Sequence, residues 1–451
     1  MTVEAPAADI ARFCTELRFG EVPPRVRERT KDILLDSLAS ALAGHDASES
    51  KTFQGFAAKI AQGSGATVIG GENLSPAAAT MVNGYLITAV TVCDIHRATH
   101  CHVTPEVVPP ALAVAEQLDS EGAELLLALT LGLEVTTRIG LALKPDVFRG
   151  RGWHAPGVAG PFGAAVAAGR LLSLDPAEFR SAFGLAGSQA AGSYAQLRTP
   201  TIKFQQARGA LSGLLAAWLA SRGFTSAQEI LLHPDGGLLR THTDGGDPDA
   251  AVDGLGERWE LENISLRAWP VAVQLQPLVT SLMELIERYS LQAEAVSSVS
   301  VDVSDIAYQL HGEVDWSDRF RARLSVAYVT GIVLTDHRCW LEQFTPERVQ
   351  DVALGRFIRE SITVRVDPGL PEGTVRVNLV MRDGSRYEDR RSVARGEPSA
   401  PLTRSDIREK FLAAASGILN ASATRDVIEQ VESLEDVPHV GELVRRLRRQ
   451  K

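Results

Sequence analysis

The sequence predicts a mainly helical protein with a smaller α+β unit inserted before a helical C-terminus. Three observations support this prediction. The first 250 or so residues are rich in Ala and Gly, and their apolar residues recur at helical spacing. After about residue 265 apolar and polar residues alternate, and a helical pattern returns at 406–419. Three- and four-residue spacing is typical of amphipathic helices, whereas strict alternation is typical of half-buried strands.

The N-terminal part contains two legible helix starts. A helix is predicted between Pro23 and Gly44, because proline suits a first turn and glycine a helix end. Its regularly spaced apolar residues are Val26, Ile33, Leu34, Leu38, Ala41 and Leu42. A second helix is predicted from Asp175, since Glu178 completes a capping-box pattern. The small residues of 182–195 are expected to pack in the middle of a helical bundle.

The strands are predicted in the second half of the chain. Period-two alternation occurs at 296–303, 361–367 and 374–381, and an Asp-Gly turn at 382–386 follows the last of these. Helical patterns lie between them at 271–288 and 322–334. The chain therefore interleaves helices and strands here, as an α+β unit does. The basic tail 444–451 has the spacing of a helix end.

Composition excludes several classes of protein. The 451 residues include 46 Lys+Arg and 56 Asp+Glu, a formal charge of −10, and 45% are hydrophobic. These values exclude a disordered or collagen-like chain, and the net acidity argues against non-specific nucleic-acid binding. Four dispersed cysteines do not make a disulfide scaffold. No signal peptide or membrane span is evident, so we expect a cytoplasmic protein without a membrane partner.

The densest ionisable cluster is 93–102, which holds three of the ten histidines, two cysteines and Asp94. If this segment is helical, His96 and His100 share a face at metal-ligand spacing. A metal site built on His96, His100 and His102 is one interpretation. A polar loop that caps the next helix is a second. An acid/base site is the third, because histidine titrates near neutrality.

Three further candidates lie downstream. His154 stands among Gly and Pro residues in 152–163. Lys203 and Arg208 could hold a carboxylate, or they could form a solvated helix start. Arg267 lies where the two patterns meet, and crevices between domains often bind ligands. The glycine pairs lack the strand–glycine–helix context of a nucleotide-binding loop.

Six segments together resemble the MmgE/PrpD family, in the same order along the chain. The closest match is GlyTrpHisAlaProGlyValAlaGlyProPheGlyAlaAla. The matching segments are 33–44, 83–95, 102–113, 152–165, 207–217 and 325–331.

The resemblance implies a large all-α domain formed by both chain ends, at 1–266 and 405–451, with an inserted α+β lid domain at 267–404. It also implies a homodimer and an active site between the domains that works without metal or organic cofactor. Family members remove water, lose CO2 or invert a centre next to a carboxylate. These reactions need proton donors and acceptors, and cations that hold carboxylates.

The family's site residues carry over only in part. His102 and His154 fall on its two active-site histidines, and Asp94 remains from an Asp-rich stretch. At other positions this chain has a different residue from the family. It has Val92 where the family has a catalytic Asp, His96 where Thr is usual, and Ile202 where a Lys binds substrate. It also has Gln205 in place of His, Arg267 in place of Lys and Gln276 in place of His. Lys203 stands one place after the expected Lys. The altered charges predict an acid other than the family's usual tricarboxylate, less highly charged and larger.

The resemblance therefore predicts a cofactor-independent lyase or isomerase acting on a small or medium organic acid. His102 and His154 would form the proton-transfer pair, with His96 and His100 as additional proton-transfer groups. Lys203 and Arg267 would anchor a carboxylate or carbonyl, and Asp94 and Gln205 would complete the substrate site. Two alternatives remain. One is a family member that binds a ligand or partner without turnover, and the other is the metal enzyme described above.

Overall fold

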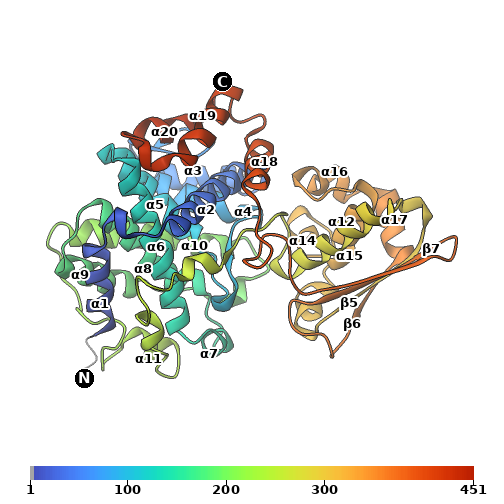
Figure 1. Ribbon diagram of the computed structural model, residues 1–451, viewed down its shortest axis with the longest axis horizontal. Coiled ribbons are helices and arrows are strands. Elements are labelled where there is room, and N and C mark those ends of the chain that lie inside the picture. Colours follow the sequence, from blue (N-terminus) through green and yellow to red (C-terminus); the bar gives the residue numbers. More distant parts are fainter. Residues whose placement is uncertain (1–4, 451) are drawn as a thin grey trace. The chain divides into compact units, whose positions relative to one another are not determined.

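The computed structural model describes residues 5–450, and its chain divides into two compact units. Within the described residues, unit 1 takes in 5–89, 93–265 and 403–450, and unit 2 takes in 90–92 and 266–402. The chain is mainly α-helical, as predicted (Figure 1).

Unit 1 is built from helices and a few two-residue strands. Its α-helices are α1 (Pro6–Glu16), α2 (Pro24–Ala43), α3 (Ser50–Ile60), α4 (Pro76–Ala89), α5 (Thr104–Leu118), α6 (Gly122–Ala142), α7 (Pro145–Gly150), α8 (Ala155–Leu171), α9 (Pro176–Gly187), α10 (Thr201–Ala220), α11 (Leu238–His242), α18 (Arg404–Ala415), α19 (Ala421–Glu432) and α20 (Val440–Arg446). Its strands β1 (Ala66–Thr67) and β2 (Asn73–Leu74) pair with each other, as do β3 (Ile95–His96) and β4 (Ile264–Ser265).

The centre of unit 1 is α8, which packs against α5, α6, α9 and α10 (Figure 1). Small residues allow this close packing. A β-carbon at Gly163 would collide with Thr136 on α6, and one at Gly213 would collide with Ala164 on α8. Among the described helices, only α6 is long and apolar enough to cross a membrane, but 94% of its apolar window is buried inside the protein. We therefore interpret α6 as a core helix.

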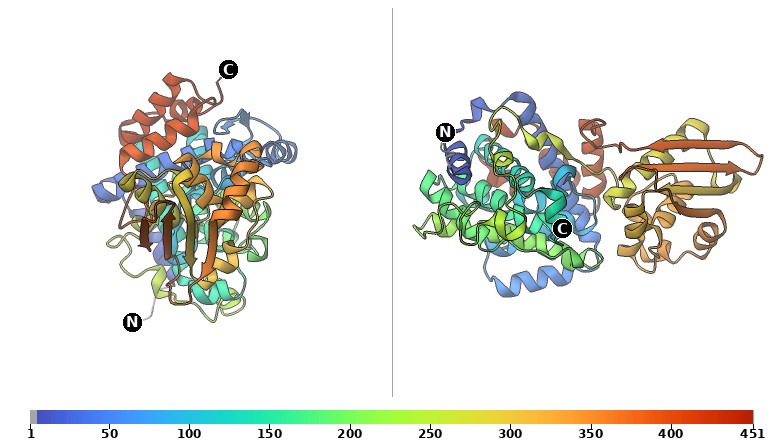
Figure 2. Two further views of the ribbon diagram at one scale, coloured as in Figure 1. Left: turned by 90° about the vertical axis from the view of Figure 1, so that its right-hand side faces the viewer. Right: turned by 90° about the horizontal axis from the view of Figure 1, so that it is seen from below.

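Unit 2 contains a four-stranded sheet. Its strands are β5 (Val296–Val303), β6 (Ile362–Val366), β7 (Val375–Met381) and β8 (Arg386–Arg391), in the order β6-β5-β7-β8. Only the β5–β6 pair is parallel. The helices are α12 (Gln276–Tyr289), α13 (Asp305–Ala307), α14 (Arg319–Ala322), α15 (Val326–Asp336), α16 (Pro346–Val349) and α17 (Val352–Ser361). Figure 2 shows α12, α15 and α17 on one face of the sheet, where the buried residues of β5 and β7 form the core.

Several local predictions are confirmed. The helix α2 begins at Pro24 and is followed by Gly44, and Asp175 caps α9 with a capping box. The predicted strands correspond to β5, β6 and β7, and the Asp-Gly turn joins β7 to β8. The basic tail follows α20, although Lys451 lies outside the described residues.

One local prediction was wrong. The small residues of 182–195 do not all lie in a helix, because α9 ends at Gly187. The loop after α9 pairs instead with the segment before α8, through a bridge between Trp153 and Ser193.

Candidate functional site

The histidine-rich segment 93–102 is an irregular loop between α4 and α5. It contains β3, a 3-10 turn at Arg97–Thr99, and His100 in the left-handed conformation with φ 51°. The segment is not helical, so His96 and His100 do not share a helix face at metal-ligand spacing, and the interpretation as a polar loop before the next helix agrees with its backbone. The cause is tertiary, because Ile95 and His96 pair with residues of β4 that lie far along the chain.

Asp94 fixes both the start of α5 and the orientation of His102. Its buried carboxylate accepts hydrogen bonds from the backbone amides of Val103 (2.8 Å) and Thr104 (3.2 Å), and from the Thr104 hydroxyl. Its backbone carbonyl lies 2.6 Å from Nδ1 of His102. Burial raises the pKa of Asp94 to about 6, even though the amides and the hydroxyl favour its ionised form.

His102 is therefore held in one tautomer. A carbonyl oxygen only accepts hydrogen bonds, so Nδ1 carries the proton and Nε2 keeps a lone pair. The Cys93 thiol also lies 3.8 Å from Nδ1. The side chain of His102 is half-buried, so it can exchange protons with solvent.

His154 lies at the N-terminal end of α8 and is oriented by Gln205 of α10. Its Nδ1 is 2.8 Å from Oε1 of Gln205, while the amide nitrogen of Gln205 donates to the carbonyl of Ser193 at 3.0 Å. Because Ser193 fixes the direction of the amide, Oε1 must accept from His154. His154 thus also carries its proton on Nδ1 and has a free lone pair on Nε2.

Burial and nearby positive charge keep His154 neutral. Burial is the largest cause that lowers the pKa of His154 to about 3, and the charges of His102, Lys203 and Arg149 lower it further. The charges of His102, Lys203 and Arg149 are therefore all close enough to act on His154. Lys203 is buried, with 6% of its surface exposed, which excludes the solvated helix start considered for it.

Sequence reasoning did not identify Arg149 or Tyr194. The guanidinium carbon of Arg149 lies 3.3 Å from the centre of the Tyr194 ring. The Tyr194 ring in turn meets His154 edge-on, with 6.2 Å between ring centres. The segment before α8 and the loop after α9 make this contact, because the Tyr194 amide donates to the carbonyl of Gly152. The position of Arg149, five residues before His154, was the only signal available in the sequence.

His96 and His100 occupy other positions. His96 is buried, with Nδ1 2.9 Å from the Thr99 hydroxyl and Nε2 3.7 Å from a carboxylate oxygen of Glu260. This contact with His96 is the largest cause that lowers the pKa of Glu260 to about 2. Both ring nitrogens of His96 thus have partners, and His100 is exposed on the loop.

The two arginine candidates, Arg208 and Arg267, lie in different environments. Arg208 donates to the backbone carbonyls of Gln189 and Ala191, both at 2.7 Å, so it holds the loop after α9. Arg267 is buried and belongs to unit 2.

The first turn of α5 carries a buried acid, Glu106. Glu106 has no exposed surface, and within residues 5–450 neither of its carboxyl oxygens has a hydrogen-bonding partner from another residue. Its side chain packs against Gly160 of α8 and Gly209 of α10. Burial is the main cause that raises the pKa of Glu106 well above its ordinary value, so the acid is held neutral.

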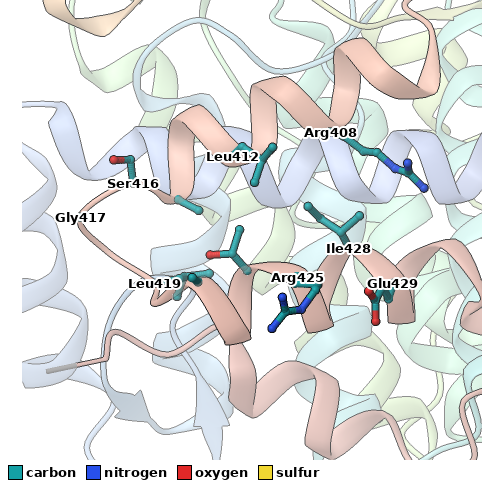
Figure 3. Close-up of a pocket in the computed structure, with 11 residues that line it drawn as sticks. Arg408, Leu412, Ser416, Gly417, Leu419, Arg425, Ile428 and Glu429 are labelled. Carbon is teal, nitrogen blue, oxygen red and sulfur yellow. The ribbon is translucent and has the colours of Figure 1, made fainter.

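The described residues offer no metal centre. No group of three or more His, Cys, Asp or Glu side chains in residues 5–450 is arranged to hold a metal ion. A separate cavity of about 570 Å³ lies between α18 and α19 (Figure 3). Leu412, Arg425 and Ile428 are among its lining residues, and none of the histidines described above lines it.

Comparison with known families gives two matches that together span most of the chain. Residues 8–251 match the MmgE/PrpD N-terminal domain, and residues 269–436 match the MmgE/PrpD C-terminal domain.

Individual relatives are similar over nearly their whole length. A cis-aconitate decarboxylase-like protein, oryM, of Aspergillus oryzae is 28% identical, covering 97% of this chain and 96% of that protein. The cis-aconitate decarboxylase of Aspergillus terreus is 27% identical, covering 97% and 94%. The human cis-aconitate decarboxylase is 25% identical, covering 93% and 90%.

Proposed function

Because this chain belongs to the MmgE/PrpD family, we propose that it is a lyase that transfers protons next to a carboxylate of an organic acid. The observation that carries the proposal is the paired arrangement of His102 and His154. Each ring donates its Nδ1 proton to a fixed acceptor and so presents an unprotonated Nε2.

The two histidines suit different halves of a proton-transfer reaction. His154 is neutral at pH 7 and can act as the base. His102 is half-buried, so it can take a proton from solvent and deliver it as the acid. Lys203 would hold a substrate carboxylate, and Arg267 is a second candidate on the strength of the family resemblance.

Decarboxylation is the favoured reaction, because the relatives named above are cis-aconitate decarboxylases or resemble them. In such a step the bond between carbon and carboxylate breaks, and its electron pair enters a conjugated double bond. The carbon on which charge accumulates then takes the proton of protonated His102. The products are CO2 and an acid with one carboxylate fewer, and His102 regains its proton from water.

The substrate is proposed to differ from the family's usual tricarboxylate. This chain lacks three groups of the family's pattern: a carboxylate at Val92, a cation at Ile202 and a titratable ring at Gln205. Each lost charge-assisted contact weakens recognition of a third carboxylate. An unsaturated dicarboxylate, with or without an apolar substituent, fits the remaining charges.

The experiment is a comparison of three histidine variants on a panel of unsaturated di- and tricarboxylates, with CO2 release and product NMR as readouts. We expect His102→Ala and His154→Ala to lower kcat/KM by at least about 10²-fold, the usual worth of a general acid or base. His100→Ala is the matched control, because His100 is exposed, and it should change kcat/KM less than threefold. Near wild-type activity in both of the first two variants would overturn the assignment.

A further inference from the structure

Arg149 is a cation beside His154 without an acidic partner. Its guanidinium carbon lies 3.3 Å from the centre of the Tyr194 ring, and no carboxylate of the described residues forms an ion pair with it. It is half-buried at the end of the short helix α7. Other half-buried arginines among the described residues, such as Arg348 and Arg391, are paired with carboxylates. A fixed guanidinium without a counter-ion is suited to a ligand anion.

The neighbouring contacts fix Arg149 in place. The Tyr194 ring lies against the guanidinium, and the same ring is tilted edge-to-face against His154. The next residue towards the N-terminus, Phe148, is buried and packs near the ring of His242, which anchors α7. Arg149 therefore has little freedom to move, and less conformational entropy is lost when it binds an anion.

We propose that Arg149 is a second carboxylate-binding residue of the site, which acts together with Lys203, so that the ligand is a dicarboxylate. This inference rests on the proposed function only for the identity of the site, since binding can be measured without turnover. The guanidinium presents two parallel N–H donors to one carboxylate, while Lys203 serves the other as a point charge. Arg149 thereby supplies a cation that the family's usual positions do not predict.

The test is the binding of maleate, a small unsaturated dicarboxylate, measured by isothermal titration calorimetry on the full chain. Arg149→Gln should weaken maleate binding at least tenfold, and Arg149→Lys should give an intermediate affinity. The matched control is Arg151→Gln, because the Arg151 side chain is exposed two residues further on. It should change the affinity less than twofold.

Maleate monomethyl ester is the second ligand to be tested on the same variants. The ester carries one carboxylate, so Arg149→Gln should weaken its binding less than threefold. Loss of Arg149 should also raise the pKa of His154, since Arg149 lowers it, and NMR titration of the ring reports this separately. Melting temperatures of the variants near that of the wild type would show that they fold.

The outcomes separate this inference from the proposed function. Tight, Arg149-dependent binding of maleate with no turnover of any acid in the panel would support the subsite and reject the lyase. An equal loss of affinity for maleate and its ester would reject the subsite, even if acids are decarboxylated. Failure of the wild-type protein to bind maleate or any other dicarboxylate at 10 times a typical KM of about 1 mM would also overturn it.

Discussion

At the scale of single residues, Gln205 shows how one amide sets the chemistry of a histidine. Gln205 cannot take up a proton, so it orients His154 without competing for the transferred proton. The resemblance suggested a place for Gln205 in the substrate site. The structure gives it a contact with His154, and a second contact with Ser193 that fixes the amide; its place in the substrate site stays a prediction.

Glu106 provides a prediction about pH. Its folded-state pKa lies well above the ordinary value of 4.5, so between these two values the folded chain holds a proton that the unfolded chain has released. The contribution of protonated Glu106 to the free energy of unfolding is therefore complete below about pH 4.5. As pH rises from there towards the raised pKa, the free energy of unfolding falls by about 1.4 kcal/mol per pH unit. The glutamine of the Glu106→Gln variant cannot ionise, so this variant should not show the fall in the free energy of unfolding with pH.

Urea denaturation from pH 4.5 to 9 measures the effect. The stability of the Glu106→Gln variant relative to the wild type should increase with pH. Glu257→Gln is the control, because Glu257 is exposed, and its difference from the wild type should stay flat. A difference for Glu106→Gln that does not change with pH would show that Glu106 is ionised in the folded protein.

At the scale of elements, the start of α5 couples helix capping to the site. Asp94 and Asp175 both cap helices. Of the two, only Asp94 also accepts a hydrogen bond from a histidine, because its backbone carbonyl contacts Nδ1 of His102. Asp94→Ala should cost at least about 2 kcal/mol, because it leaves buried amides without an acceptor, and should lower kcat/KM at least tenfold. Asp175→Ala should cost about 1 kcal/mol and leave kcat/KM unchanged.

Denaturation and steady-state kinetics on the two variants separate the effects. Loss of stability with full activity in Asp94→Ala would mean that the start of α5 does not position His102.

The same two caps show what a sequence can predict. Asp175 was recognisable because its partners lie two and three residues away. The cap at Asp94 was not, because the chain first makes a loop of eight residues before it returns to Val103. The pairing of β3 with β4 was not predictable for a similar reason, since β4 lies about 170 residues further along the chain. Local patterns were sufficient for α2, β5 and β7, whereas contacts between distant segments were not predictable.

At the scale of the whole molecule, the order of the matching segments was enough to identify the family. The family match spans residues 8–251 and 269–436, and the mainly helical class is confirmed. The resemblance did not reveal Arg149, because that residue lies outside the matching segments, between 102–113 and 152–165. Homodimer assembly and independence of cofactors stay predictions.

The central claim is that His102 and His154 form a proton-transfer site in which His102 delivers a proton to carbon. The most direct measurement is the reaction of the wild-type protein with unsaturated dicarboxylates in D2O, followed by NMR and mass spectrometry. We predict that the product carries one deuterium on the carbon where charge accumulated, next to a retained carboxylate, and that His102→Ala abolishes this incorporation. A product without carbon-bound deuterium, or undiminished incorporation in both histidine variants, would contradict the account.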